Sequence, residues 1–356
     1  MAAPDYFSNN YLSARSRFIA AACAAGATMD ELHLDAMGPN GMPLATEIAW
    51  LGCEDPERVV IHSSGIHGVE GFAGSAVQLA LLSSDIKIPD DSALILVHCL
   101  NPYGMAWLRR FNENNVDLNR NFVAIDDNRT GAADAYRQLD ALLNPPGTPG
   151  IDMFYPRAAF SILRHGMPAL RQAVAEGQYE YPKGLFFGGK QFEQGPLLFL
   201  GWLSLHLKSV RKLFAVDVHT GLGKWGSETL YLRSGGASPE DATSLSGRLG
   251  RPLVSDPAAT GAYDIRGLLS EVFDMLDTDF EWNFVLQEFG TYPGIRVLNA
   301  LRKENQWHHY GDGNVDHWAK LQMKKMFAPD SPEWRESVVD RGVAFCRQVI
   351  DLAFSE

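Results

Sequence analysis

The sequence contains a histidine and a glutamate at a spacing that suits metal binding. His67 and Glu70 lie three positions apart in a glycine-rich segment that follows the short apolar run 59–61. On one helical turn or in a tight loop, this spacing lets both side chains face one point. A catalytic zinc ion commonly takes three nitrogen or oxygen ligands of this kind and leaves a fourth position for water. Since the same pair occurs by chance in many proteins, the interpretation needs support from other segments.

Polar residues follow three other apolar runs that we expect to be buried strands: Asn119 and Arg120 in the long loop after residues 94–99, His219 after 213–218 and Glu288 after 284–287. In open α/β sheets, binding sites form beyond the carboxyl ends of the strands. These side chains and the first pair are therefore expected to converge at one edge of the sheet.

The converging residue types match the needs of a metal-dependent hydrolase that cleaves an amide bond. Such an enzyme needs a metal ion to polarise the carbonyl group and acidify a water, a general base, and a cation where the oxyanion develops. We interpret His67, Glu70 and His219 as the ligand set for zinc and Glu288 as the base. An arginine from the segment 109–120 would stabilise the oxyanion.

The elements that must position these residues alternate between strands and helices. The order strand, loop, helix, strand over residues 59–99 is a βαβ pattern, which predicts a partly parallel sheet covered by helices. We expect an α/β fold with three α/β/α layers around a central mixed, mostly parallel, twisted sheet, formed as a single domain over residues 1–356. Strands are expected at 44–51, 59–62, 94–99, 213–218 and 284–287, and helices at 9–25, 72–84, 132–143, 158–175, 196–209, 315–327 and 333–353.

Composition narrows the classes of partner. The chain has 356 residues and a net charge of -12, which argues against nucleic acid and against an anionic membrane as partners. The sequence lacks the apolar run of about 18 residues that a membrane span requires. Four widely spaced cysteines favour a reducing compartment, and we expect a cytoplasmic protein. The segment 15–26 superficially resembles a signal peptide, but an alanine-rich amphipathic helix explains it better. The sequence gives no prediction of oligomeric state.

Five segments together carry a resemblance to a known family. The chain resembles the zinc carboxypeptidase superfamily (peptidase M14, carboxypeptidase A-like) and, within it, the DUF2817 branch beside the aspartoacylase and succinylglutamate desuccinylase deacylases. The matching segments occur in the family's order within residues 45–300, with C-terminal helices over 301–356: Gly65-Ile-His67-Gly-Val-Glu70, Asn101-Pro-Tyr-Gly104, Asn115-Val-Asp117-Leu-Asn119-Arg120-Asn121-Phe122, Asp217-Val-His219-Thr-Gly221 and Gln287-Glu288-Phe-Gly-Thr291.

The resemblance implies roles for individual residues. His67, Glu70 and His219 match zinc ligands and Glu288 matches the general base. Arg110 matches the arginine that stabilises the oxyanion, and Arg109 is an alternative for this role. Asn119 and Arg120 match the pair that binds the carboxylate of the substrate. Two readings of Asp217 stay open, a partner of His219 or a buried structural carboxylate.

The sequence departs from the family pattern at Tyr103, where aspartate is usual, and at Asn115, where glycine is usual. Both positions are expected to be details of turns, since asparagine tolerates positive φ. The tyrosine that covers the substrate in carboxypeptidases has no secure match, and Tyr263 is the candidate.

The expected substrate is a small molecule or short peptide with a free carboxylate next to the scissile amide. Two chemistries remain open, a carboxypeptidase and a deacylase of N-acyl amino acids. The alternative is a catalytically silent relative of the same fold that binds zinc or a ligand. A serine hydrolase is disfavoured because the sequence has no Gly-x-Ser-x-Gly nucleophile elbow.

Overall fold

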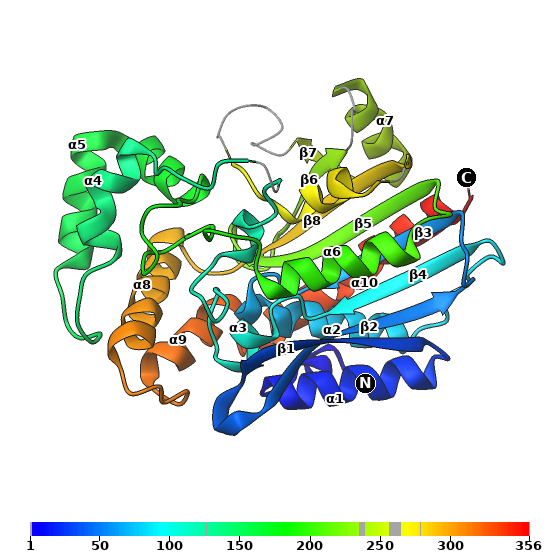
Figure 1. Cartoon of the computed structure of the whole chain (residues 1–356), viewed down its shortest axis with the longest axis horizontal. Helices are drawn as coiled ribbons and strands as arrows, with labels where there is room; N and C mark the ends of the chain where they lie inside the picture. Colours follow the sequence, from blue (N-terminus) through cyan, green and yellow to red (C-terminus); the bar gives the residue numbers. More distant parts are fainter. Residues whose placement is uncertain (1, 125–126, 235–238, 256–264, 278, 356) are drawn as a thin grey trace.

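The computed structural model describes residues 2–124, 127–234, 239–255, 265–277 and 279–355 (Figure 1). Over these residues, an 8-stranded sheet has the order β1-β2-β4-β3-β5-β8-β6-β7. The four strands β4, β3, β5 and β8 run parallel in its centre. On one side, β2 is antiparallel to β4 and β1 to β2; on the other, β6 is antiparallel to β8 and parallel to β7. The strands are β1 (Thr28–Met37), β2 (Pro43–Gly52), β3 (Arg58–Ser64), β4 (Ser92–His98), β5 (Lys212–Gly221), β6 (Glu228–Ser234), β7 (Val254–Ser255) and β8 (Glu281–Gly290).

Helices connect and cover the strands. The α-helices in the described part of the chain are α1 (Tyr11–Ala24), α2 (Gly71–Leu82), α3 (Pro102–Ala106), α4 (Asp134–Leu143), α5 (Phe154–Ala175), α6 (Gln194–His206), α7 (Pro239–Leu249), α8 (Gly294–Tyr310), α9 (Trp318–Phe327) and α10 (Pro332–Ser355). Short 3-10 helices are η1 (Ala3–Tyr6), η2 (Pro39–Gly41), η3 (Gly68–Glu70), η4 (Leu118–Arg120) and η5 (Leu269–Met275). None of these helices combines the length and the apolar character needed to cross a bilayer.

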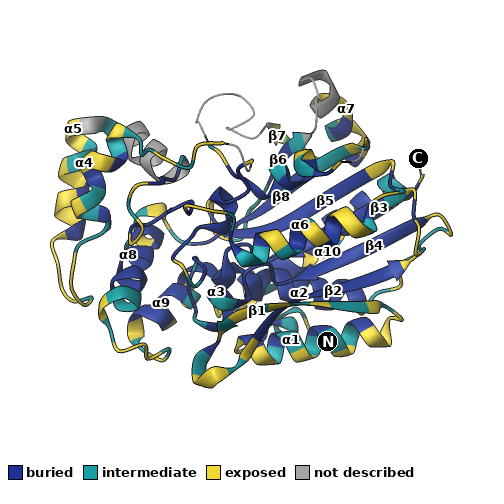
Figure 2. Cartoon of the chain, viewed as in Figure 1, coloured by how far each residue is buried: buried dark blue, intermediate teal, exposed yellow. Residues whose placement is uncertain are grey.

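Each face of the sheet packs into its own hydrophobic core. Alternate residues of a strand point to opposite faces, and β3 shows this directly. Val60 belongs to the core under α1, α2, α7 and α10, whereas Val59 and Ile61 belong to the core under α6 and η5. The central strands are buried along nearly their whole length (Figure 2), as expected for a parallel sheet covered on both faces.

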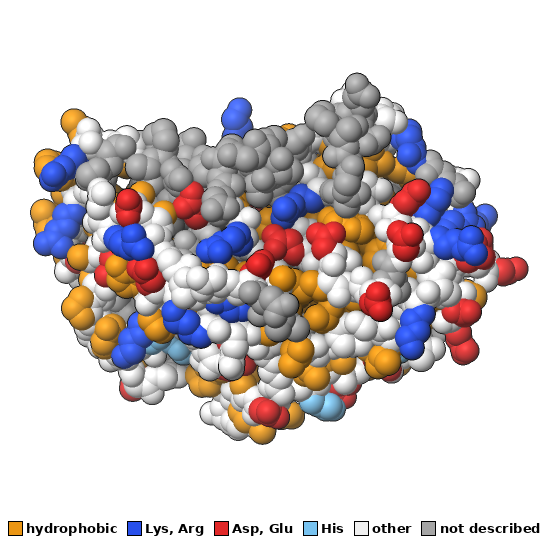
Figure 3. All heavy atoms as spheres, turned by 45° about the horizontal axis from the view of Figure 1, so that its top comes forward, with side chains coloured by type: hydrophobic (Ala, Val, Ile, Leu, Met, Phe, Trp, Pro, Cys, Tyr) orange, Lys and Arg blue, Asp and Glu red, His pale blue; other side chains and the backbone are white. Residues whose placement is uncertain are grey.

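A third group of helices lies beyond one end of the strands. The helices α4, α5, α8 and α9 share a separate hydrophobic core, and Figure 1 shows them grouped to the left of the sheet. The helix α9 also packs against η3, the turn that contains Glu70. These helices therefore border the edge where the predicted site residues lie. On the face turned forward in Figure 3, acidic, basic and hydrophobic side chains are interspersed.

The predicted α/β architecture is confirmed, including the βαβ unit, in which the parallel strands β3 and β4 are joined through α2. The sequence analysis missed β1, β6, β7, α3 and α7. The strand β1 is an edge strand whose residues are only half-buried or exposed. Its apolar residues are interspersed with charged and polar ones, so it lacks the continuous apolar run by which the other strands were predicted.

Candidate metal centre and active site

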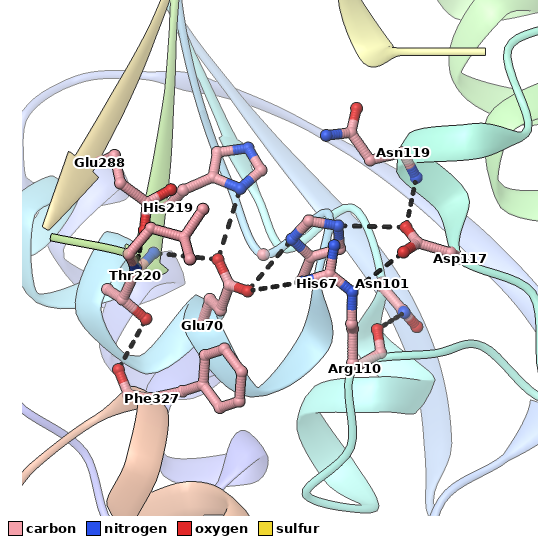
Figure 4. A network of polar contacts seen from close by, with 12 residues as sticks. His67, Glu70, Asn101, Arg110, Asp117, Asn119, His219, Thr220, Glu288 and Phe327 are labelled. Atoms are coloured by element: carbon pink, nitrogen blue, oxygen red, sulfur yellow. Dashed lines mark hydrogen bonds and ion pairs between the residues drawn. The ribbon is translucent and has the colours of Figure 1, made fainter. Parts of the chain in front are cut away.

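Three side chains that are far apart in the sequence meet at the carboxyl ends of β3 and β5. His67 and Glu70 come from the turn between β3 and α2, and His219 comes from β5. Nδ1 of His67 is 3.1 Å from Oε1 of Glu70, and Nδ1 of His219 is 3.4 Å from Oε2 of the same carboxylate (Figure 4). One ligand atom from each side chain lies within 4.8 Å of the other two. The predicted ligand set is therefore assembled.

The second ring nitrogen of each histidine faces a buried carboxylate. Nε2 of His67 lies 3.1 Å from Oδ1 of Asp117, and Nε2 of His219 lies 2.6 Å from Oδ2 of Asp217. A carboxylate behind a histidine fixes the ring orientation and the tautomer in many metal sites. Both Nδ1 atoms are thereby directed toward Glu70. The sequence left open whether Asp217 is a partner of His219 or a buried structural carboxylate, and in the structure it contacts His219.

The site has an electrostatic pattern that fits a metal ion. Nδ1 of His67 is buried and makes no hydrogen bond among the described residues, and its contact at 3.1 Å is with Oε1 of Glu70, another proposed ligand atom. Burial alone would raise the pKa of Glu70, but His67 and His219 lower it below its ordinary value. Burial alone would lower the pKa of His219, but Asp217 and Glu70 raise it to about 10. Two imidazoles and one carboxylate form a donor set typical of a catalytic divalent metal.

Glu70 is also fixed by the backbone of the neighbouring strand. Its Oε2 accepts a hydrogen bond of 2.9 Å from the backbone N–H of Thr220. The hydroxyl of Thr220 in turn donates to the backbone carbonyl of Phe327, at the end of α9. These contacts give Glu70 a defined rotamer at the meeting point of β5, α9 and the metal loop, by which we mean residues 65–70.

Glu288 lies next to this centre because its strand is the register partner of β5. His219 and Glu288 are paired residues of the parallel strands β5 and β8. Glu288 is 6% exposed, and its Oε1 accepts a hydrogen bond of 2.8 Å from the backbone N–H of Leu222. Gly221 has φ +136°, which lets the chain turn after β5 and bring this N–H to the carboxylate. Burial and the nearby Glu70 raise the pKa of Glu288 to about 7.

Arg110 and Arg109 point to different places. Nη1 of Arg110 is 3.3 Å from Oε1 of Glu70, and its Nε donates to Oδ2 of Asp117 at 2.9 Å. Arg109 turns away from the centre and lies 3.4 Å from Oε1 of Glu304 on α8. Of the two arginines that the sequence left open, Arg110 is therefore the one at the metal centre.

Asn119 and Arg120 follow directly after Asp117 in η4. The backbone N–H of Asn119 donates to Oδ1 of Asp117 at 3.1 Å, and Oδ1 of Asn119 accepts from the backbone N–H of Leu269 at 2.8 Å. Arg120 is 7% exposed, and its Nη1 donates to the carbonyl of Asn119. Asn119 is thus bonded directly to the carboxylate that contacts His67, and Arg120 is linked to it through the carbonyl of Asn119. Tyr263 lies outside the described residues.

Sequence reasoning missed the role of Asp117. This residue is fully buried and contacts His67 and Arg110 at the same time. Interactions with Arg110 and His67 hold the pKa of Asp117 well below its ordinary value, against the opposing effect of burial. One signal was present, since the aspartate lies between the apolar residues Val116 and Leu118. A carboxylate between two apolar residues indicates burial, and a buried carboxylate needs charged or hydrogen-bonding partners.

The fold is that of the zinc carboxypeptidases. The structure of thrombin-activatable fibrinolysis inhibitor has a TM-score of 0.51 at 10% identity and covers 98% of this chain and 74% of that chain. The chain belongs to the DUF2817 family, whose model, described as a protein of unknown function, matches residues 7–341.

Two other solved structures are similar at lower scores. Carboxypeptidase A from Helicoverpa armigera has a TM-score of 0.49 at 12% identity, covering 90% of this chain and 73% of that chain. Murein-tripeptide amidase MpaA from Escherichia coli O157 has a TM-score of 0.38 at 17% identity, covering 79% and 92%. No curated protein matches the chain.

Proposed function

We propose that the protein is a zinc-dependent hydrolase that cleaves an amide bond in a small molecule or short peptide with a free carboxylate. The observation that carries this proposal is the arrangement of four side chains at one end of two paired strands. His67, Glu70 and His219 face one point, and Glu288 is held beside them by the pairing of β5 with β8. A silent relative would have no need to keep the fourth residue together with the ligand set.

Zinc, when bound by His67, Glu70 and His219, would polarise the scissile carbonyl group and acidify a water. Glu288 takes the proton of the attacking water and passes it to the leaving nitrogen. Its raised pKa, about 7, supports this role because a general base works best when its pKa is near the operating pH. Leu222 holds one oxygen of Glu288 through its N–H and so orients the carboxylate.

The arginines supply positive charge at two places. Arg110 presents its guanidinium beside Glu70, where it would stabilise the oxyanion that develops on the carbonyl oxygen. Asn119 and Arg120 would bind the free carboxylate of the substrate, a task that suits the planar guanidinium fork. Tyr263 remains the candidate for the residue that covers the bound substrate.

One experiment tests the proposal and separates the two chemistries. The protein is purified without added metal, analysed for metal content, and assayed with and without a chelator. The substrates are a panel of N-blocked dipeptides and a panel of N-acyl amino acids. We expect about one zinc ion per chain and chelator-sensitive release of an amino acid. Turnover of the first panel would identify a carboxypeptidase, and turnover of the second alone would identify a deacylase.

Two results would contradict the proposal. Failure to bind zinc even after incubation with it would mean that the three ligands do not act together. Zinc binding without turnover of either panel would support the silent relative instead. The Glu288→Gln variant, prepared in parallel, controls for contaminating hydrolases because it should bind zinc but lack activity.

We also propose that the protein works in a reducing compartment such as the cytoplasm. All four cysteines, Cys23, Cys53, Cys99 and Cys346, are free thiols in the structure. Proteins of oxidising compartments commonly use cysteines in disulfides. Labelling of free thiols under denaturing conditions, in protein taken directly from cells, tests this, and labelling of fewer than four would contradict it.

A further inference from the structure

Three buried charged side chains meet where α8 and α9 contact the segment after α3, and they have no part in the proposed reaction. Arg109 and Glu304 are 0% exposed and Lys320 is 2% exposed. Oε1 of Glu304 is 3.4 Å from Nε of Arg109 and 2.5 Å from Nζ of Lys320. Glu304 belongs to α8 and Lys320 to α9, so the cluster ties both helices to the segment that follows α3.

The guanidinium of Arg109 is held in one orientation by several contacts. Its Nη2 donates to Oδ1 of Asn115 at 2.7 Å and lies 3.4 Å from Oδ1 of Asn305. The side chain also lies over the ring of Phe111, with 5.6 Å between the guanidinium carbon and the ring centroid. A planar fork with several partners is fixed more firmly than a lysine ammonium group would be.

The backbone of the same arginine pair supports the metal loop. The carbonyl of Arg109 accepts a hydrogen bond of 3.0 Å from the N–H of Val69, and the carbonyl of Arg110 accepts one of 3.3 Å from the N–H of Gly68. Both N–H groups lie between the two proposed ligands of the loop. Any shift of residues 109–110 would therefore move the loop and the Arg110 side chain together.

Stability alone does not explain this cluster. Two cations and one carboxylate are buried together, and burial lowers the pKa of Lys320 to about 8 although Glu304 opposes the shift. Buried ion pairs commonly contribute no more stability than well-packed apolar residues of similar volume. What the charged groups supply in addition is a fixed geometry at the position of Arg109.

We propose that Arg109 is a positioning residue: its side chain, held by Glu304 and Asn115, fixes the backbone that presents Arg110 to Glu70 and Asp117 and that supports the metal loop. The two arginines lie in the bend after α3 and their side chains leave it in different directions, Arg109 toward Glu304 and Arg110 toward Glu70. The inference rests on the proposed function, in which Arg110 acts on the substrate.

A direct test follows the Nε–H of Arg110 by NMR. This group donates to Oδ2 of Asp117 at 2.9 Å, and we expect a slowly exchanging signal that an Arg110→Lys variant removes and so assigns. The signal should be lost in Arg109→Met and weakened in Arg109→Lys. An unchanged signal in a folded Arg109→Met protein would overturn the proposal. If Arg109→Met does not fold, Glu304→Gln replaces it with the same expected loss.

Kinetics provide the second readout. At saturating zinc, Arg109→Met should lower kcat roughly 10- to 100-fold, with KM within about twofold of the parent value. Combining it with Arg110→Ala should cost little beyond the loss seen in Arg110→Ala alone, because Arg109 acts through Arg110. Losses that multiply in the double variant would contradict this route.

A matched control uses a second buried arginine, which lies on α8, the helix that also carries Glu304. Arg302 is 3% exposed and pairs with Asp152, away from the metal loop. Arg302→Met should lower stability but leave the Arg110 signal and kcat unchanged, and a loss of the signal there would show that any damage to α8 has the same effect. If Arg110→Ala itself keeps full activity, the proposed function loses its oxyanion residue, and the NMR result still decides the positioning role.

Discussion

Oδ2 of Asp217 lies 2.6 Å from Nε2 of His219, two residues further along β5. Because the two side chains leave the same face of the strand, the aspartate turns Nδ1 of His219 toward Glu70. Asp217→Asn removes the negative charge behind the imidazole and should weaken zinc binding about 10- to 100-fold. Competition with a chelating dye measures this. Asp91→Asn, in an exposed ion pair with Arg58, is the control. Equal affinity of both variants would show that Asp217 has a structural role only.

Glu288 is predicted to be essential for turnover but not for zinc binding. Glu288→Gln keeps an acceptor for the N–H of Leu222 but cannot take a proton, so kcat should fall roughly 10²- to 10⁴-fold. Glu281→Gln, at the exposed start of the same strand, is the control and should leave kcat unchanged. Retained turnover in Glu288→Gln, with zinc bound, would remove this residue as the base.

Arg120 is predicted to act on substrate affinity. Arg120→Ala should raise KM roughly 10- to 100-fold, since a hydrogen-bonded charge pair with the substrate carboxylate is lost. Arg120→Lys should recover part of the affinity because it restores the charge without the planar fork. Steady-state kinetics measure both, with the exposed Arg137→Ala as control. A KM for Arg120→Ala equal to that of the parent protein would exclude the assigned role.

Gly68 is predicted to tolerate no side chain. An added Cβ would lie 2.1 Å from the carbonyl carbon of Gly104 and 2.2 Å from the backbone nitrogen of Met105, and backbone atoms cannot move aside as a flexible side chain can. Gly68→Ala should therefore destabilise the protein by about 3 kcal/mol and also weaken zinc binding, because the metal loop must move.

The matched control for this prediction is Gly201→Ala in α6, where an added Cβ meets no atom within 4 Å. That variant should stabilise the helix by about 0.5–1 kcal/mol. Urea titrations of the chelated proteins compare the two. A Gly68→Ala protein as stable as the parent would show that the loop and α3 can separate without cost.

His62 and His98 are predicted to make stability depend on pH. Burial lowers the pKa of each to about 4. Below pH 6.5, the unfolded chain binds protons that the folded protein does not bind, so stability is present above pH 6.5 and is lost as the pH falls toward 4. For one such histidine the loss between pH 7 and pH 5 is about 2 kcal/mol.

Urea titrations of the parent protein and of His62→Leu at both pH values measure this contribution. The variant should lose about 2 kcal/mol less than the parent protein, whatever the two absolute stabilities are. Because both proteins share every other titrating group, the difference isolates His62. Equal losses would mean that His62 takes up its proton in the folded state.

Much of the site could be predicted because its residues follow apolar runs. His219 and Glu288 each end a buried strand, and parallel strands place such ends at one edge of the sheet. What could not be predicted depends on contacts across the chain. The adjacent residues Arg109 and Arg110 lie in a bend and face different ways, but the sequence does not say which one faces the candidate metal site. Asp117 contacts His67 across 50 positions of sequence, and only the fold brings them together.

The pairing of His219 with Glu288 in the register of β5 and β8 has a consequence for how the protein can change. The separation of the proposed base and the proposed metal ligand is set by backbone hydrogen bonds of the sheet, and a shift of one residue in either strand would turn its side chain to the opposite face. Evolution or an engineer can therefore exchange the surrounding loops, and with them the substrate, while the distance between the reacting groups stays constant. New specificity should come from the loops, and the reaction itself should be inherited with the sheet.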